Sequence, residues 1–257
     1  MAKKNIEISD GAAIPTEEDK GLVTAWQVVF TGTVILLIFF CVFKPHPYLD
    51  ILRFMSDGIV VTFKLTLICM GLSFIVGLFT GIGRISQNKF INLLASIYVE
   101  VIRGIPLLVQ LFYIYYAVGS FVKVSPFISA VIALTICYGA YMGEVFRAGI
   151  ESIDKGQIEA ALSLGFNKRQ TMFYVVLPQA MRTILPPVGN EFIALLKDTS
   201  LVSIIAVADL FRRAREYATA TFNYFETFTM VALVYLLITL ILSKFVGYME
   251  KKLTPYK

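Results

Sequence analysis

Six long apolar runs constrain this chain more than any other feature of its sequence. The first, Leu22 to Phe43, has no charged residue, and its 22 residues are enough, at about 1.5 Å each, to cross a hydrocarbon core of about 30 Å. The other runs are Ile59–Gly83, Leu93–Val122, Phe127–Phe146, Val188–Asp209 and Phe228–Gly247. Together they predict an all-α polytopic membrane protein with about six transmembrane helices.

The composition excludes an ordinary soluble domain. Hydrophobic residues make up 57% of the chain and charged residues only 16%, whereas soluble domains average about 25% charged. The net charge of +5 comes from lysines and arginines scattered between apolar runs, which suits a cytoplasmic lipid leaflet better than nucleic acid. The cysteines, Cys41, Cys69 and Cys137, lie inside apolar runs and indicate no disulfide framework or CxxC site.

The chain divides into a tail, an extra span and a main domain. Residues 1–20 mix acidic and basic side chains with Gly and Pro, which predicts a disordered cytosolic tail. Residues 21–50 carry the first span and an outer loop. A cleaved signal peptide is the alternative, but Lys44 and Pro45 follow the run in place of a small-residue cleavage site, which favours a retained helix. No internal repeat or Gly/Ser linker follows, so residues 51–253 form one domain.

The distribution of basic residues predicts the orientation. With a cytosolic N terminus, thirteen basic residues are inside and six outside, as the positive-inside rule expects. The inside set is Lys3, Lys4, Lys20, Arg84, Lys89, Arg147, Lys155, Lys168, Arg169, Arg182, Lys251, Lys252 and Lys257; the outside set is Lys44, Arg53, Lys123, Arg212, Arg213 and Arg215. Both termini are then cytosolic. The outer arginines in Phe211–Tyr217 indicate either a solvated amphipathic helix or a docking surface.

Several polar and small residues within the spans carry structural expectations. Glu100 and Arg103 lie three residues apart on one helical face and can pair, and Glu144 and Arg147 repeat this spacing. Pro106 is expected to kink the third span. The second span presents small residues for close helix packing at Gly71, Ser73, Gly77, Gly81 and Gly83.

A polar interval of about forty residues separates the fourth and fifth runs, and Glu159–Pro187 is its main part. Asp154 and Asn167 stand where helix N-caps are expected, and Gly165 stands where a first short helix should stop. The interval therefore predicts two short helices with a bend between them. Residues Ala160 and Ala161 let a partner surface approach closely. Two interpretations remain open here: a plug for another protein's groove, or an ordinary amphipathic interfacial helix pair.

The interval resembles a known motif. EAALSLGFNKRQTMFYVVLP is similar to the EAA motif of bacterial ABC importer permeases, in register at Glu159, Ala160, Ala161, Gly165, Leu177 and Pro178, with Val175 at the family's isoleucine position. YVEVIRGIPLLVQLF, YGAYMGEVFRAGI, LPPVGNEF and LLKDTSLVS resemble the histidine, arginine and glutamine permeases of the polar amino acid subfamily. The resemblance covers roughly residues 51–253. Such permeases usually have five spans, so Leu22–Phe43 is an addition.

The resemblance implies a type I ABC importer permease fold and a set of partners. These are a cytosolic ABC ATPase dimer, a second permease subunit (the same chain or another), an extracytoplasmic amino acid-binding protein, an amino acid substrate and the lipid of a prokaryotic cytoplasmic (inner) membrane. The EAA segment would be the coupling helix seated in the ATPase. The chain has no GxxxxGK[ST] loop, so ATP would be bound and hydrolysed on the partner, with no cofactor on this chain.

Two other function classes are weaker. A secondary transporter or channel would need no ATPase and no cytosolic plug. An intramembrane enzyme would need a catalytic set, whereas the only histidine, His46, lies outside the runs and no GxSxG elbow or metal-ligand cluster occurs. The chain is therefore expected to be a transport subunit without enzymatic activity.

Ionisable groups at bilayer depth are candidates for substrate binding. Glu191 and Asp198 fall on nearly one face of the fifth span, and Lys197 lies about 100° from Asp198. We expect Asp198 or Glu191 to bind the ammonium group of the substrate and Lys197 to bind the carboxylate group of the substrate. Thr199 and Ser200 would add hydrogen bonds. A salt bridge of Lys197 or Asp198 that only stabilises helix packing is the alternative. Any zwitterionic amino acid would fit these groups.

Overall fold

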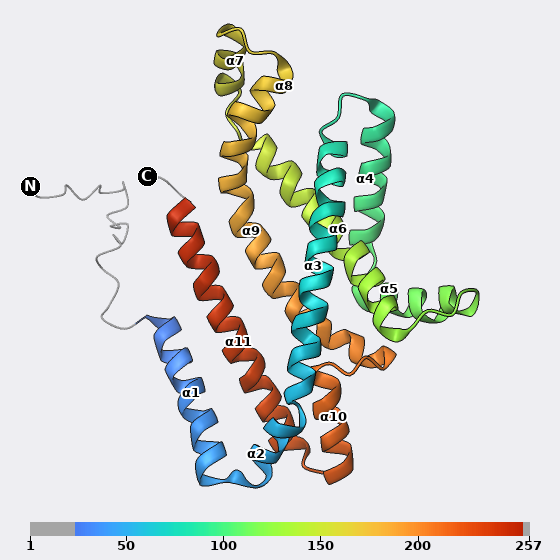
Figure 1. The fold of residues 1–257 in the computed structure, drawn as a ribbon, viewed down its shortest axis with the longest axis vertical. Coiled ribbons are helices and arrows are strands. Elements are labelled where there is room, and N and C mark those ends of the chain that lie inside the picture. The colour runs from blue at the N-terminus through green and yellow to red at the C-terminus, as the bar shows by residue number, and fades with distance from the viewer. Residues whose placement is uncertain (1–23, 254–257) are drawn as a thin grey trace, which may run out of the picture.

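The computed structural model describes residues 24–253, and the expected tail at residues 1–20 lies outside them. The described residues form helices and no strand, in a bundle with one helical segment projecting from an end (Figure 1). The α-helices are α1 (Ala25–Phe43), α2 (Pro45–Phe54), α3 (Ser56–Arg84), α4 (Lys89–Gly104), α5 (Leu107–Phe112), α6 (Pro126–Glu151), α7 (Lys155–Ser163), α8 (Lys168–Gln170), α9 (Leu177–Asp198), α10 (Leu210–Thr221) and α11 (Tyr224–Leu253).

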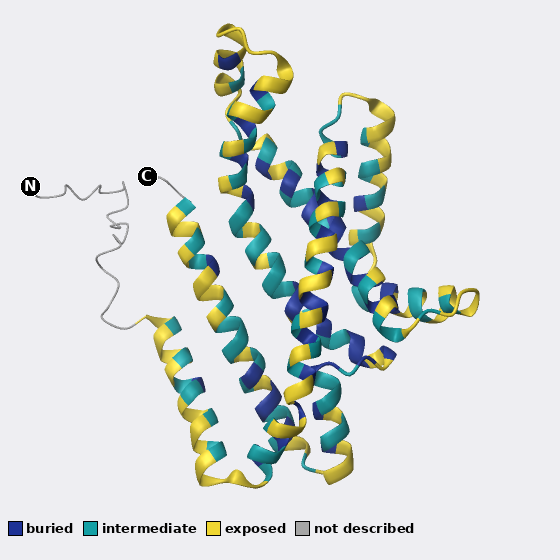
Figure 2. Cartoon of the chain, in the orientation of Figure 1, coloured by how far each residue is buried: buried dark blue, intermediate teal, exposed yellow. Residues whose placement is uncertain are grey.

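Among residues 24–253, four helical stretches are long and apolar enough to cross a membrane: α1, the stretch Pro45–Arg84 that joins α2 and α3, α6 and α11. A fifth candidate is a bent pair, in which α4 meets the segment Leu107–Ser120 at 100°. Their outward faces are largely exposed and apolar (Figure 2), as lipid contact requires. The all-α membrane fold agrees with the prediction.

Pro106 breaks the third predicted span more sharply than a kink. Ile105, which precedes it, has extended backbone angles, because a proline disfavours the helical region for the residue before it. The break leaves carbonyls of α4 without helical partners. Gln110, which is buried, donates from Nε2 to the carbonyls of Ile102 and Ile105, at 2.8 Å each. This amide therefore fixes the turn from α4 into α5.

The predicted bounds of the fifth span, Val188–Asp209, were wrong. The helix in this region is α9, which begins at Leu177 and ends at Asp198. A 3-10 turn, Thr199–Ile205, follows, and Ala206 then adopts a left-handed conformation. The helix α9 carries four charged side chains and packs between α6 and α11. Contact with protein rather than lipid lets this segment carry charges.

Close packing of α3 against α6 forms the centre of the bundle. A Cβ atom added at Gly77 would lie 2.2 Å from Met142 Cβ, and one at Gly81 would lie 2.6 Å from Phe146 Cβ. Gly83 instead faces Ala95 of α4, and Gly71 faces open space. Two of the predicted small residues thus let the α3 and α6 backbones approach closely, which is a common basis of helix association in membranes.

This packing predicts a large difference between two glycine substitutions on one helix. Gly77→Val forces a side chain into Met142 and should lower the stability of the solubilised protein by about 1–3 kcal/mol, the usual cost of overpacking. Gly71→Val on the open side of α3 is the matched control. Thermal unfolding in detergent measures both. Equal stability of the two variants would contradict this account of the α3–α6 contact.

The two predicted ion pairs within the spans had different outcomes. Glu144 and Arg147 pair on α6 as predicted, with Arg147 Nε donating to Glu144 Oε1 at 3.2 Å. The pairing of Glu100 with Arg103 was wrong. Glu100 instead lies 3.9 Å from Arg84 of α3, and the Arg103 guanidinium lies 5.2 Å from the Tyr141 ring centroid. Both side chains find partners on neighbouring helices, which sequence spacing does not reveal.

The extra N-terminal helix α1 packs along α11. The Trp26 indole Nε1–H donates to the carbonyl of Leu240 at 3.0 Å, and Lys244 Nζ lies 4.6 Å from the centroid of the same ring. At the other end of α1, Phe40 stacks on Tyr48 of α2. Of the helix predicted over Leu22–Phe43, the part Ala25–Phe43 is present as α1, and residues 22 and 23 lie outside the described part of the chain. Contacts with α2 and α11 hold α1 to the bundle.

Candidate functional site

A polar pocket of about 460 Å³ lies where the bend between α4 and α5 meets α6 and α9. The bend contributes backbone that is not helical, and α6 and α9 contribute side chains from inside the bundle. The residues that line it are Arg103, Gly104, Ile105, Pro106, Leu107, Cys137, Tyr138, Tyr141, Glu191, Ala194 and Asp198. Irregular backbone at this depth is tolerated in membrane proteins where it lines a cavity.

Charged groups of both signs face this pocket. Two carboxylates, Glu191 and Asp198, come from α9, and one guanidinium, Arg103, comes from the end of α4. The Tyr138 hydroxyl donates to Asp198 Oδ2 at 2.8 Å, which fixes the orientation of that carboxylate. The Tyr141 ring lies against Arg103. A ligand with separate ammonium and carboxylate groups is complementary to this arrangement.

The structure brings together only part of the predicted substrate site. Glu191 and Asp198 line the pocket, whereas Lys197 is exposed on another side of α9. Thr199 is fully buried and donates its hydroxyl to the carbonyl of Leu196 at 2.6 Å, and Ser200 is not part of the lining. The angle of about 100° between consecutive helical residues separates Lys197 from Asp198, as the sequence indicated.

Arg103, Tyr138 and Tyr141 were not predicted as site residues. Arg103 was assigned only as a partner of Glu100, and the tyrosines stand in an apolar stretch of α6. One signal was present: an arginine inside a mainly apolar run, three residues before the proline that breaks the helix. Within the described residues, no group of three or more His, Cys, Asp or Glu side chains could hold a metal ion.

The second candidate site is the projecting segment formed by α7 and α8. Asp154 caps α7 by accepting from the Gly156 N–H, and Asn167 caps α8 in a reciprocal arrangement with Gln170. Gly165 adopts φ +87° after the end of α7. The Gly165 and Phe166 N–H groups donate to the carbonyls of Leu162 and Ala161, which forms a Schellman motif. The predicted helix–bend–helix is confirmed.

The residues of the predicted coupling motif lie on two elements of this segment. Glu159, Ala160 and Gly165 are exposed on α7 and just after it, while Ala161 is buried. Leu177 and Pro178 begin α9, beyond a π-helical turn at Thr171–Val176. The structure thus presents the first half of the motif on the projecting surface and places the second half at its base.

The projecting segment also exposes large apolar side chains. Leu164, just after α7, is 79% exposed, and Tyr174 and Phe173 in the π-helical turn after α8 are 72% and 64% exposed. The segment stands at one end of the molecule, and much of its surface is exposed (Figure 2). Exposed apolar groups at a polar tip are typical of a protein contact surface. Sequence spacing alone did not single out these residues.

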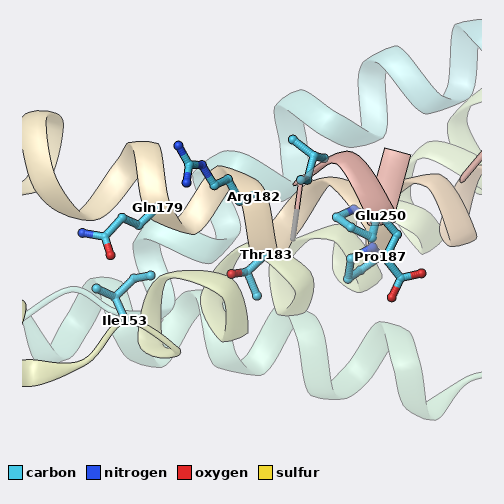
Figure 3. A pocket seen from close by; sticks show the side chains of 8 residues that line it. Ile153, Gln179, Arg182, Thr183, Pro187 and Glu250 are labelled. Atoms are coloured by element: carbon cyan, nitrogen blue, oxygen red, sulfur yellow. The ribbon is translucent and has the colours of Figure 1, made fainter. Parts of the chain in front are cut away.

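A further pocket of about 530 Å³ lies at the base of the projecting segment. Figure 3 shows Gln179, Arg182, Thr183 and Pro187 from α9 beside Ile153, which precedes α7, and Glu250 of α11. This recess, whose lining mixes polar and apolar side chains, lies next to the segment and between α9 and α11. The segment is therefore attached to the bundle through α6 on one side and α9 on the other.

The fold and these two sites define a class of protein: the membrane-spanning subunit of a transporter, with a polar pocket inside its bundle and a contact segment at one end. Residues 73–255 match the family described as "Binding-protein-dependent transport system inner membrane component". The match covers more than half of the sequence. The chain therefore belongs to this family of ABC importer permeases, which are transport subunits and not enzymes.

Relatives named as permeases for L-cystine and glutamine are similar to most of this chain. The L-cystine transport system permease protein TcyB of Bacillus subtilis is 42% identical over 204 residues, covering 79% of this chain and 87% of the relative. The glutamine transport system permease protein GlnP of Escherichia coli K12 is 37% identical over 200 residues, covering 77% and 91%. A crystal structure of an amino acid ABC transporter with histidines superposes with a TM-score of 0.76 at 41% identity, covering 80% of this chain and 98% of that one.

Proposed function

We propose that this chain carries a polar amino acid across a prokaryotic cytoplasmic membrane, driven by ATP hydrolysis on a partner. The observation that carries the proposal is the pocket in which Arg103 faces Glu191 and Asp198 inside a bundle of importer fold. Relatives and a solved structure named for amino acid transport support this substrate class. A charged pocket within a membrane bundle is costly unless a ligand or partner uses it.

In this proposal the substrate lies across the pocket with its charges paired. Asp198, oriented by Tyr138, and Glu191 hold the ammonium, and Arg103 replaces Lys197 as the partner of the carboxylate. A planar guanidinium can donate two parallel hydrogen bonds to a carboxylate, which also fixes the orientation of that carboxylate. Thr199 has no contact role here, since its hydroxyl is already bonded to the chain.

The projecting segment provides the coupling to the ATPase. Glu159, Ala160 and the exposed Leu164 present a surface that a cleft of the partner covers, while the capped ends of α7 and α8 keep its shape. Closure of an ATP-bound ATPase dimer would then move this segment and switch the pocket between inward-facing and outward-facing states. ATP is bound by that partner, and this chain supplies no nucleotide site.

The complete importer in this proposal contains four kinds of component. This chain pairs with a second permease, either another copy or a related chain, and the pair contacts two ATPase subunits. An extracytoplasmic binding protein delivers the amino acid. The excess of basic residues at the end with α7 and α8 supports a cytosolic location for this end and for both termini.

A reconstituted importer tests the proposed function. The chain is purified with its ATPase and placed in lipid nanodiscs for hydrolysis measurements and in vesicles for uptake measurements. Both are made with the binding protein and each amino acid in turn. We expect one polar amino acid, or a small group of them, to stimulate hydrolysis and to accumulate in vesicles only when ATP is supplied. Uptake that continues without ATP and follows an ion gradient would instead identify a secondary transporter.

A further inference from the structure

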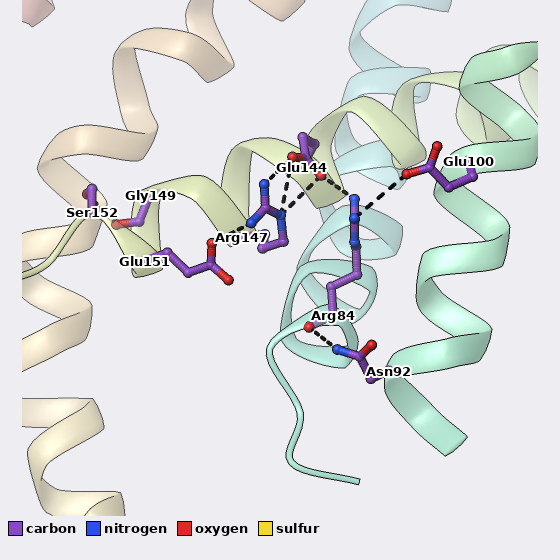
Figure 4. A network of polar contacts seen from close by, with 8 residues as sticks. All are labelled: Arg84, Asn92, Glu100, Glu144, Arg147, Gly149, Glu151 and Ser152. Atoms are coloured by element: carbon purple, nitrogen blue, oxygen red, sulfur yellow. Dashed lines mark hydrogen bonds and ion pairs between the residues drawn. The ribbon is translucent and has the colours of Figure 1, made fainter. Parts of the chain in front are cut away.

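A network of five charged side chains joins three helices at the end of the bundle that carries the projecting segment (Figure 4). At its centre, Glu144 of α6 contacts both Arg84 of α3 and Arg147 of α6. Arg147 also contacts Glu151, the last residue of α6, and Arg84 also lies 3.9 Å from Glu100 of α4. The network therefore runs from the end of α6 through α3 to α4.

One end of this network adjoins the projecting segment. Glu151 ends α6, and α7 begins at Lys155, so only residues 152–154 separate the two helices. Ser152 continues the hydrogen-bonding pattern of α6, because its N–H donates to the carbonyl of Ala148. A displacement of α7 is therefore transmitted directly to the last turn of α6, where Arg147 and Glu151 are held together.

The other end of the network leads to the polar pocket. Glu100 and Arg103 lie one turn apart on α4, and α4 ends at Gly104 where the 100° bend begins. Arg103 is a lining residue of the pocket and contacts Tyr141 of α6. A small rotation of the end of α4 therefore changes the position of the guanidinium relative to Glu191 and Asp198.

The contacts within the network differ in strength, and this determines which one can change. The Arg84 side chain is 16% exposed and its contact with Glu144 is shielded, whereas Glu100 is 78% exposed and lies at the limit of ion-pair distance. Exposed ion pairs are weak and break at little cost. The glycine contacts keep α3 and α6 together below the network. The contact between Arg84 and Glu100 is thus the one that opens most easily.

We propose that Arg84 and Glu100 are positioning residues that link the state of the coupling segment to the position of Arg103 in the substrate pocket. The proposal rests on the proposed function, because it takes α7 as the ATPase contact and the pocket as the amino acid site. When α7 is displaced, α6 moves Glu144 and Arg84 together. The contact between Arg84 and Glu100 then breaks or forms. The end of α4 shifts as a result, and the Arg103 guanidinium moves into the substrate pocket or out of it.

The test compares amino acid uptake with ATP hydrolysis in the reconstituted importer. Glu100→Gln removes one exposed charge without disturbing packing, and Arg84→Met removes the central cation. We expect each variant to hydrolyse ATP at the basal wild-type rate but to transport up to about fivefold less amino acid per ATP, the upper limit for loss of an exposed ion pair and the lower end of the usual coupling between sites. The double variant should lose no more than Arg84→Met alone, because Arg84→Met already removes the contact with Glu100. Arg84→Lys keeps the positive charge, so it should transport more amino acid per ATP than Arg84→Met does.

Arg213→Gln is the matched control for loss of an ion pair on α3. Arg213 of α10 donates to Asp57 of α3 at 2.7 Å at the opposite end of that helix, and this hydrogen bond raises the pKa of the guanidinium. The control should keep the wild-type transport ratio. The proposal would be overturned if Glu100→Gln and Arg84→Met transported the wild-type amount of amino acid per ATP. It would also be overturned if Arg213→Gln lowered this amount as much as they do. If no amino acid stimulated ATP hydrolysis by the wild-type importer, the proposed function itself would be overturned.

Discussion

Replacing Asp198 with asparagine is expected to lower amino acid uptake by about 10- to 100-fold. A hydrogen bond to a charged group contributes roughly 1.5–3 kcal/mol, and each 1.4 kcal/mol corresponds to about tenfold in affinity. Asparagine keeps the size of the side chain and an oxygen that can accept from the Tyr138 hydroxyl, so the pocket should fold normally. Uptake of labelled amino acid into vesicles, with ATP and the binding protein present, measures the effect.

Lys197→Met provides the control from the adjacent position. Lys197 is charged and exposed but does not line the pocket, so its loss should leave uptake within about twofold of wild type, as for most exposed charges. Thermal unfolding of both variants separates loss of binding from loss of fold. If Lys197→Met abolished uptake and Asp198→Asn did not, the substrate would bind on the other side of α9.

The sequence predicted the helices and caps well because the physical rules behind them are local. The length of an apolar run, the cap at Asn167 and the left-handed Gly165 each depend on a few neighbouring residues. The pair of Glu144 with Arg147 was found for the same reason, since both belong to one helix turn. The fold class and the shape of the projecting segment follow from such local rules.

The composition of the pocket could not be predicted because it depends on which helices face each other. Helical periodicity placed Glu191 and Asp198 on one face of α9, but it gave no information on the partner helices. Arg103 reaches the pocket only because the chain turns by 100° after Gly104, and Tyr138 reaches it because α6 packs against α9. The glycine contact of α3 with α6, which fixes these positions, is likewise a relation between distant residues.

Two substitutions in the projecting segment are expected to disconnect the chain from its ATPase. Glu159→Lys reverses an exposed charge on α7 without affecting its helix, and Gly165→Val places a branched side chain at φ +87°, a strain of about 1–3 kcal/mol that distorts the end of α7. Both variants should insert normally into the membrane. We expect at least about tenfold weaker association with the ATPase, because mispaired charges at an interface cost several kcal/mol.

The control for these variants is Lys89→Glu, which also changes an exposed charge by two units at the same end of the bundle but lies on α4, outside the segment. It should retain ATPase association and uptake. Co-purification with the ATPase measures association, and ATP-dependent uptake measures its consequence. Because Glu159→Lys alters only the surface and Gly165→Val alters the shape of the segment, loss in both identifies the segment itself as the contact. Normal association and uptake in both variants would rule out α7 as the point where ATP hydrolysis acts on this subunit.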